Sequence, residues 1–186
     1  MGYSIAESLA DFGAEVLLVS GPVSVTVSHP GIKVIPVESA REMYEVCLHH
    51  FPECDGAVMT SAVADFTPVN PQQQKVKRGR ENYKIELQPT HDIAASLGFL
   101  KKKNQLLIGF ALETQSESEN ARRKLEKKNL DFIVLNSLND MGAGFGYDTN
   151  KITIIDRNNK MWPFELKTKK EVANDIVKMI VSFVNG

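Results

Sequence analysis

The chain has 186 residues, of which 42% are apolar, and its 22 basic and 23 acidic residues leave a formal net charge of −1. This length suits one domain with a sizeable core, and the even balance of charge argues against a disordered tail or a nucleic-acid-binding arm. No stretch approaches the roughly 18 consecutive apolar residues of a membrane-spanning helix, and the first residues do not resemble a secretory signal peptide. We therefore expect a globular cytoplasmic domain that binds neither nucleic acid nor membrane.

Helix and strand patterns alternate along the chain. Ile5, Leu9 and Phe12 lie at helical spacing ahead of Gly13, which predicts an opening helix that ends at a glycine. Ser39 followed by Glu42 is a capping box, which predicts a helix to about residue 51. Further helices are expected at about 92–100, 116–128 and 172–183, and strands at 15–20, 33–37, 56–60, 83–87, 106–110, 130–135, 151–156 and 161–166.

Helices between short apolar strands indicate an α/β fold of the Rossmann-like type, with a mostly parallel sheet and helices on both faces. The last two strands, joined by a turn at residues 157–159, add a C-terminal antiparallel hairpin. A doubly wound sheet normally begins with a strand and a glycine-rich turn, whereas this chain begins at a helix. We therefore expect residues 1–186 to form one domain from which the opening strand is missing.

Residues 61–83 interrupt the alternation with prolines, three consecutive glutamines and a basic cluster. A segment of this length in a small domain is usually functional or disordered, and we expect a flexible loop at 67–82. Lys75 and its basic neighbours could close over an anion and exclude water from it. A solvated basic loop without a ligand is the alternative interpretation.

Ligands of open parallel sheets bind beyond the carboxyl ends of the strands. Small and polar residues follow several predicted strands, at 20–22, 60–65 and 110–114 and at Asn136. The small residues 61–64 would let the backbone approach a ligand, and the Asp65 carboxylate could then accept hydrogen bonds from a sugar or hold a metal. The alternative is an aspartate that caps a helix or closes a turn.

Lys124 and Lys128 lie four residues apart, so they project from the same face of a predicted helix. Ala121 and Leu125 are expected to face the core beside them. Two ammonium groups at the edge of a sheet could meet a phosphate chain, although an ordinary charged helix face would show the same pattern.

A metal site is not predicted. Cys47, His49, His50 and Cys54 cluster in the sequence, but their spacing matches no standard zinc-ligand pattern. The chain also has no P-loop, no intact GxGxxG turn and no GxSxG elbow.

Taken in chain order, these segments resemble one known family, the bacterial phosphopantothenoylcysteine synthetases of coenzyme A biosynthesis. The resemblance covers essentially the whole chain. The motifs that carry it are Met1-Gly2 before the opening helix, Leu18–Val23 (LVSGPV), Ala62–Phe66 (AVADF), Lys75–Arg78 (KVKR), Pro89–Ile93 (PTHDI), Ile108–Thr114 (IGFALET), Lys124–Asp131 (KLEKKNLD), Asn136, and Gly144–Asn150 (GFGYDTN).

The resemblance implies an enzyme that works as a homodimer with Mg²⁺ and joins 4′-phosphopantothenate to cysteine. CTP would first convert the substrate carboxylate into an acyl-cytidylate with release of pyrophosphate, and the cysteine amine would then displace CMP. The protein would supply positioning and charge stabilisation. In many bacteria this ligase is fused to a phosphopantothenoylcysteine decarboxylase, which makes a decarboxylase a further expected partner.

The resemblance also implies the residues of a nucleotide site. Lys75, as the catalytic residue, would hold the CTP triphosphate together with Lys124 and Lys128. The strand end at Met59, Thr60 and Ser61 would meet the nucleotide through its backbone, and Asp65 through its side chain. The same site would be lined by Thr90, His91, Asp92, Ile93 and Phe110, although the family has Asn-Pro where this chain has Thr90-His91.

The family's catalytic asparagine lies in a motif that would precede Met1, so we expect a chain truncated at its N-terminus and poorly active. Two further hypotheses are a non-catalytic nucleotide-binding domain and an NAD(P)-dependent reductase. The reductase should carry an acidic ribose ligand at the end of its second strand, where this chain has Ser20-Gly21.

Overall fold

The computed structural model describes residues 1–72, 74–78, 82–113, 117–137 and 148–185. The helices are α1 (Gly2–Asp11), α2 (Ala40–His50), α3 (Ile93–Leu100), α4 (Glu117–Lys127) and α5 (Lys169–Asn185), with the single 3-10 turn η1 (Phe51–Glu53) after α2. The strands are β1 (Val16–Ser20), β2 (Ile32–Pro36), β3 (Gly56–Met59), β4 (Phe66–Pro68), β5 (Leu87–Pro89), β6 (Leu106–Glu113), β7 (Phe132–Ser137), β8 (Thr149–Asn150), β9 (Ile152–Asp156), β10 (Met161–Pro163) and β11 (Lys167–Thr168).

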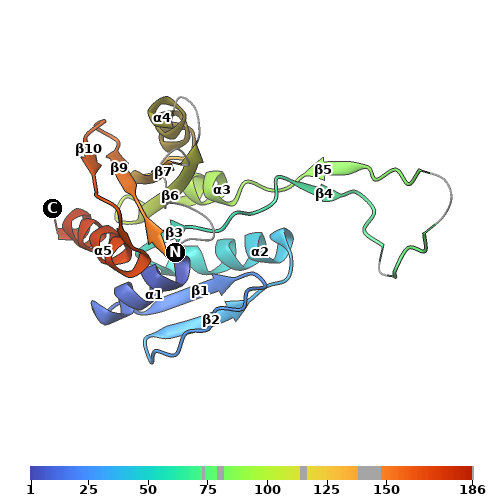
Figure 1. Cartoon of the computed structure of the whole chain (residues 1–186), viewed down its shortest axis with the longest axis horizontal. Helices are drawn as coiled ribbons and strands as arrows, with labels where there is room; N and C mark the ends of the chain where they lie inside the picture. Colours follow the sequence, from blue (N-terminus) through green and yellow to red (C-terminus); the bar gives the residue numbers. More distant parts are fainter. Residues whose placement is uncertain (73, 79–81, 114–116, 138–147, 186) are drawn as a thin grey trace.

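The centre of the molecule is a five-stranded mixed sheet in the order β10-β9-β7-β6-β3 (Figure 1). Strands β3, β6 and β7 are parallel, whereas β9 and β10 join as antiparallel neighbours and form the C-terminal hairpin. Strands β1 and β2 form a separate parallel pair. Within the described part of the chain, β1 pairs only with β2 and β3 pairs only with β6. The α/β fold with parallel strands and a terminal hairpin is therefore confirmed.

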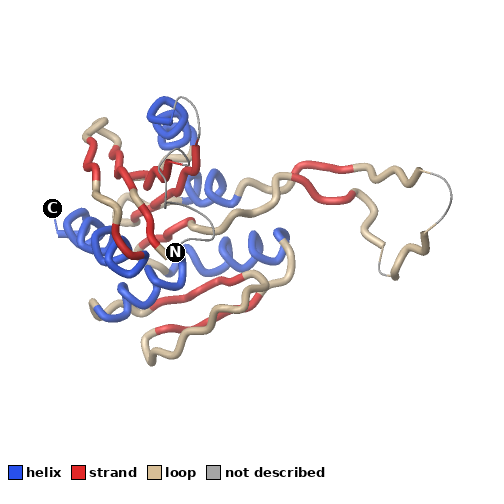
Figure 2. Tube along the Cα trace, in the orientation of Figure 1, coloured by secondary structure: helices blue, strands red, loops and turns tan. Residues whose placement is uncertain are grey.

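Helices cover both faces of the central sheet, as predicted (Figure 2). On one face α2, α3 and α4 pack against the strands, and on the other face α1 and α5 do so. Neighbouring residues of the central strands point to opposite cores, which explains why these strands are apolar throughout. Leu107, Ile133 and Leu135 belong to the first core, and Ile108, Phe132 and Val134 to the second.

Helix ends follow the local chemistry of the sequence. The Ser39 hydroxyl accepts a hydrogen bond from the Glu42 N–H at 3.1 Å, as the capping box predicts. The Glu42 carboxylate accepts from the N–H of Glu38 at 2.9 Å, one residue further back than in the standard box. Helix α1 ends ahead of Gly13, whose φ of 91° is in the left-handed region that glycine adopts without strain.

Strands β4 and β5 form a two-stranded antiparallel ribbon, the arm, that projects from the body of the molecule (Figure 1). The predicted strand at 83–87 is wrong in position, because β5 begins at Leu87 and residues 83–86 lie outside it. Strand β4 was not predicted, since three residues that include a proline give no readable alternation. The short strands β8 and β11 were also not predicted, and the other strands lie where the sequence placed them, within two or three residues at their ends.

Candidate functional site

The parallel strands end along one edge of the central sheet, and two predicted site residues meet there. Met59, the last residue of β3, is the register partner of Gly109 in β6. Phe110 therefore lies beside the segment that follows β3. The N-terminus of α1 approaches the same segment closely, because a β-carbon on Gly2 would lie 2.6 Å from the Thr60 hydroxyl oxygen. The segment that follows β3 therefore lies between β6 and the N-terminus of α1, at the edge of the sheet where ligands of such folds bind.

Hydrogen bonds join the segment after β3 to the segment after β5. The Thr90 hydroxyl donates to the Ala64 carbonyl at 2.6 Å, and the Thr90 N–H donates to the Asp65 carbonyl at 2.9 Å. The next residue, His91, stacks its ring on that of Tyr44 in α2, with ring centres 4.5 Å apart. Two predicted site segments that are 25 residues apart, Asp65 and Thr90, are therefore neighbours in the fold.

Asp92 and Lys128 form an ion pair beside these segments. The Lys128 ammonium lies 3.0 Å from the Asp92 carboxylate, while the other oxygen of Asp92 caps α3 by accepting from the Ala95 N–H at 3.0 Å. Burial opposes ionisation of Asp92, but the Ala95 N–H and the Lys128 ammonium together hold its pKa below the ordinary value. Ile93 follows this cap as a buried core residue.

Lys124 lies one helical turn before Lys128, and the Lys128 N–H donates to its carbonyl at 3.0 Å. Ala121 and Leu125 are buried beside them, at 0% and 4% exposure, which confirms the predicted orientation of α4. The Lys128 ammonium therefore lies next to the N-terminus of α3, and Lys124 lies one turn earlier on the same helix.

Lys75 lies elsewhere. It belongs to the exposed segment between β4 and β5 at the end of the arm, which extends away from the body (Figure 1). Within this chain, the structure does not bring Lys75 next to Lys124 or Lys128. Of the motif at 144–150, residues 144–147 lie outside the described residues.

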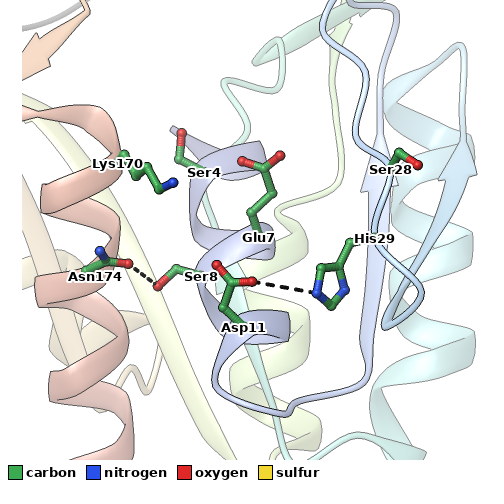
Figure 3. A pocket seen from close by; sticks show the side chains of 8 residues that line it. All are labelled: Ser4, Glu7, Ser8, Asp11, Ser28, His29, Lys170 and Asn174. Carbon is green, nitrogen blue, oxygen red and sulfur yellow. Dashed lines mark hydrogen bonds and ion pairs between the residues drawn. The ribbon is translucent and has the colours of Figure 1, made fainter.

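Among the hollows in the surface of the described residues, one is lined by a predicted residue and another is not. A cavity of about 180 Å³ lies between α1, the segment before β2, and α5 (Figure 3). In it the Ser8 hydroxyl donates to Asn174 at 2.7 Å, and Asp11 lies 3.6 Å from the His29 ring. None of the predicted site residues lines this cavity. A wider hollow of about 430 Å³ lies between α3 and the end of α4, and its lining includes Lys128.

Sequence reasoning did not identify two polar residues that contact this region, Tyr44 and Arg157. Tyr44 is far from His91 in the sequence, and nothing in its own pattern indicates a ring contact. Arg157 reaches the end of α4 from the β9–β10 turn and donates to the Leu130 carbonyl at 2.6 Å. Only the sheet topology, which places that turn beside the start of β7, could have indicated this contact.

The described ranges contain no group of three or more His, Cys, Asp or Glu side chains arranged to hold a metal ion. In the same ranges, every helix is too short or too polar to span a lipid bilayer.

Known proteins resemble the whole chain. Residues 1–184 match the family described as DNA/pantothenate metabolism flavoprotein C-terminal domain. The chain is 42% identical over 182 residues to the coenzyme A biosynthesis bifunctional protein CoaBC of Bacillus subtilis (strain 168), a match that covers 98% of this chain and 45% of that protein. It is 56% identical over 185 residues to a cysteine/cysteine sulfinic acid decarboxylase of an unknown prokaryotic organism, covering 100% of this chain and 52% of that protein.

A solved structure of a protein of the same name resembles this chain in its fold. A crystal structure of the C-terminal domain of coenzyme A biosynthesis bifunctional protein CoaBC matches with a TM-score of 0.80 and 36% identity, covering 98% of this chain and 81% of that one. The present chain spans about half the length of the curated relatives that it matches.

Proposed function

We infer the function from the family: this chain belongs to the family of the DNA/pantothenate metabolism flavoprotein C-terminal domain. We propose that it is the phosphopantothenate–cysteine ligase domain of coenzyme A biosynthesis and that it uses CTP. The similarity to the C-terminal domain of a bifunctional coenzyme A biosynthesis protein supports the ligase. The relative that is named a decarboxylase supports a decarboxylase as the partner or fusion domain. Such a ligase would act in the cytoplasm.

The observation that best supports a nucleotide triphosphate as ligand is the position of Lys128. Its ammonium lies 3.0 Å from Asp92 at the N-terminus of α3, one turn of α4 away from Lys124. One cation therefore adjoins Asp92 and the segment that precedes it, and a second lies one turn away on the same helix. A partly exposed ion pair such as Asp92–Lys128 contributes only about 0–1 kcal/mol, so a polyanionic triphosphate can take Lys128 from Asp92.

The proposed reaction has two steps. A carboxylate oxygen of 4′-phosphopantothenate attacks the α-phosphorus of CTP, and pyrophosphate leaves as the acyl-cytidylate forms. The amine of cysteine then attacks the acyl carbon and loses a proton, the amide forms, and CMP leaves. Lys75, Lys124 and Lys128 would stabilise the charge that develops on the leaving pyrophosphate. Met59, Thr60 and Ser61 would position the nucleotide through their backbone.

The remaining predicted residues would shape the same nucleotide site. Asp65 is exposed and next to Thr90, where its carboxylate could accept hydrogen bonds from the ribose. Phe110, which follows the last β6 residue paired with β3, and the segment from His91 to Ile93 would form walls of the site. The stack of His91 on Tyr44 replaces the rigid proline of the related family motif with an aromatic wall.

Mg²⁺ is proposed to arrive with the triphosphate. Magnesium sites for nucleotides commonly use one or two carboxylates together with phosphate oxygens and water. The exposed carboxylates of this region, Asp65 and Asp92, fit that pattern better than a site made by protein ligands alone. When bound, the ion would neutralise charge on the phosphates.

We further propose that the protein forms a homodimer through the arm. Phe66 pairs with Pro89 and Pro68 pairs with Leu87, so these four apolar side chains share one face of the ribbon. Phe66 and Leu87 are 58% and 54% exposed, and Tyr83 and Ile85 continue the apolar series at 63% and 61%. An isolated two-stranded ribbon is marginally stable in water. Its exposed apolar face is accordingly expected to pack against a second copy.

The two rival functions make different demands on the site. A non-catalytic domain would bind CTP without forming product. A reductase would need an acidic side chain at the end of β1 to hold a ribose. That position is Ser20, whose buried hydroxyl instead bonds the Tyr3 hydroxyl at 2.9 Å. The structure of this strand end therefore favours the ligase over the reductase.

The test combines binding with product formation. The protein is incubated with CTP, Mg²⁺, 4′-phosphopantothenate and cysteine, and pyrophosphate, CMP and the cysteine amide are measured by mass spectrometry. The ligase predicts all three products and their loss in Lys124→Gln, with Arg123→Gln on the same helix as the charge-matched control. CTP binding with no trace of the three products, even after prolonged incubation at high protein concentration, would favour the non-catalytic domain, and no CTP binding would contradict both.

A further inference from the structure

We propose that Arg157 and Asn129 are positioning residues that hold the end of α4 against α3 and so place the Lys128 ammonium for triphosphate binding. This inference rests on the proposed function, because it assumes that Lys128 holds phosphate. Neither residue lies in the predicted nucleotide site, and both act through Lys128.

Asn129 ends α4 in a conformation that few residues adopt easily. Its φ is 52°, in the left-handed region that asparagine tolerates better than most residues other than glycine. The following Leu130 N–H donates to the Leu125 carbonyl at 3.0 Å, which closes the helix in the usual left-handed C-terminal turn. The direction of the Lys128 side chain therefore depends on how this turn is held.

The side chain of Asn129 joins α4 to two other elements. Its amide nitrogen donates to the Gly98 carbonyl of α3 at 2.7 Å, and its amide oxygen accepts from the Arg157 guanidinium at 2.6 Å. Both the nitrogen and the oxygen of the amide are therefore hydrogen-bonded, and they attach the end of α4 to α3 and to the β9–β10 turn.

Arg157 completes the attachment from the β9–β10 turn. Its guanidinium also donates to the main-chain carbonyls of Asn129 at 2.7 Å and Leu130 at 2.6 Å. These carbonyls follow the C-terminus of α4, where the helix dipole favours a positive group. The turn itself is rigid, because the buried Asp156 carboxylate accepts from the N–H groups of Asn158 at 2.8 Å and Lys160 at 2.9 Å.

A largely buried ion pair between Lys101 and Asp131 also holds this region in place. Asp131 accepts from the Lys101 ammonium at 2.7 and 2.8 Å and from the Leu107 N–H at 2.7 Å, and Arg157 lies 3.4 Å from it. The chain on both sides of Asn129 is therefore fixed. Successive side chains of an α-helix point about 100° apart. Without the attachment, a small rotation of the end of α4 would therefore turn the Lys128 side chain away from Asp92.

The experiment is a double-mutant cycle on the affinity for CTP with Mg²⁺, measured by calorimetry. The variants are Arg157→Gln, Lys128→Gln and their combination, each checked for a native circular dichroism spectrum at the temperature used. We expect Arg157→Gln to weaken CTP binding about five- to tenfold in the parent chain and to have almost no effect when Lys128 is already Gln. CMP, which lacks the β- and γ-phosphates, should bind the parent and Arg157→Gln equally well.

Controls separate the possible failures. Arg123→Gln removes the same charge from the exposed face of α4 and should leave the affinity for CTP within twofold of the parent. If Lys128→Gln has no effect, the proposed triphosphate site is wrong. If Lys128→Gln weakens binding but Arg157→Gln does not, or weakens it equally in both backgrounds, the positioning role is wrong. Should Arg157→Gln fail to fold, Asn129→Gly, which keeps the left-handed turn and removes the amide, takes its place in the cycle.

Discussion

Gly98 of α3 lies directly against the main-chain carbonyl of Lys128, so closely that a β-carbon at residue 98 would overlap with that oxygen. The same glycine offers its own carbonyl to the Asn129 amide at 2.7 Å. The ends of α3 and α4 can meet only because residue 98 has no side chain. This contact sets the separation of α3 and α4, and the ion pair between Lys128 and Asp92 depends on that separation.

The contact predicts an unusual effect of an alanine substitution. In most helix interiors alanine is more stable than glycine by about 1 kcal/mol, but Gly98→Ala should destabilise the protein by about 1–3 kcal/mol because the helix ends must move apart. Urea unfolding measures the difference. Gly21→Ala, which would meet no atom within 4 Å, is the control and should change stability by less than about 0.5 kcal/mol. A Gly98→Ala protein as stable as the control would contradict the close contact.

Asp92 should make part of the stability depend on pH. Its folded-state pKa lies below the ordinary value of 3.8, so its stabilising contribution is complete above about pH 4 and is lost as the pH falls through the folded-state value. Asp92→Asn retains an oxygen that can cap α3 but removes the charge. This variant should be less stable than the parent at pH 7 by about 0.2–1 kcal/mol, and equally stable in strong acid.

Chemical unfolding at a series of pH values measures this dependence. Asp92→Ala serves as a comparison, because it also removes the cap and should cost about 1 kcal/mol more at every pH. A constant difference between the parent and Asp92→Asn from pH 2 to pH 7 would argue against the Lys128 ion pair.

Both cysteines should be poor nucleophiles at neutral pH. Burial raises the pKa of the Cys47 thiol, and burial together with the neighbouring Asp55 and Glu53 carboxylates raises that of Cys54. Because the thiolate is the reactive form, alkylation by iodoacetamide should be slow at pH 7 in the folded protein and accelerate in alkaline solution. The urea-unfolded chain is the control. A thiol in the folded protein that reacts faster than in the unfolded chain would indicate an activated cysteine that the account does not include.

The arm offers a direct test of the proposed homodimer. Ile85→Lys places a charge on its apolar face, where the isoleucine is 61% exposed, and should shift the protein from dimer to monomer in sedimentation experiments. Lys84→Glu, on the neighbouring residue, changes charge without entering the apolar series and should leave the dimer intact. A parent chain that sediments as a monomer at micromolar concentration would contradict the proposal.

The sequence predicted the elements that have strong periodicity or clear end signals. The capping residues Ser39 and Asp92, the glycine after α1 and the apolar stripes of α4 and α5 have the local chemistry that prediction relies on. Strand β4 was not predicted, and β5 was predicted at the wrong position. The pairing of these strands depends on contacts between residues about 20 positions apart and not on a local pattern.

The candidate site could be predicted only in part. Motif resemblance pointed to Lys124, Lys128 and Asp92, and the fold brings Lys128 into contact with Asp92, with Lys124 one helical turn away. The supporting contacts of Arg157 and Asn129 could not be read from the sequence, because they depend on where a distant turn lies relative to a helix end. The resemblance also suggested Lys75, but its distance from the body in this structure is a property of the arm that no sequence motif encodes.

Calorimetric titration with CTP, ATP and NADPH decides whether the carboxyl edge of the sheet and the end of α4 bind CTP. With Mg²⁺ present, we expect saturable CTP binding at one site per chain. The affinity for CTP should fall in Lys124→Gln and in Lys128→Gln and stay unchanged in Arg123→Gln. Tight binding of NADPH with none of CTP, or a CTP affinity that both lysine substitutions leave unaltered, would contradict this proposal.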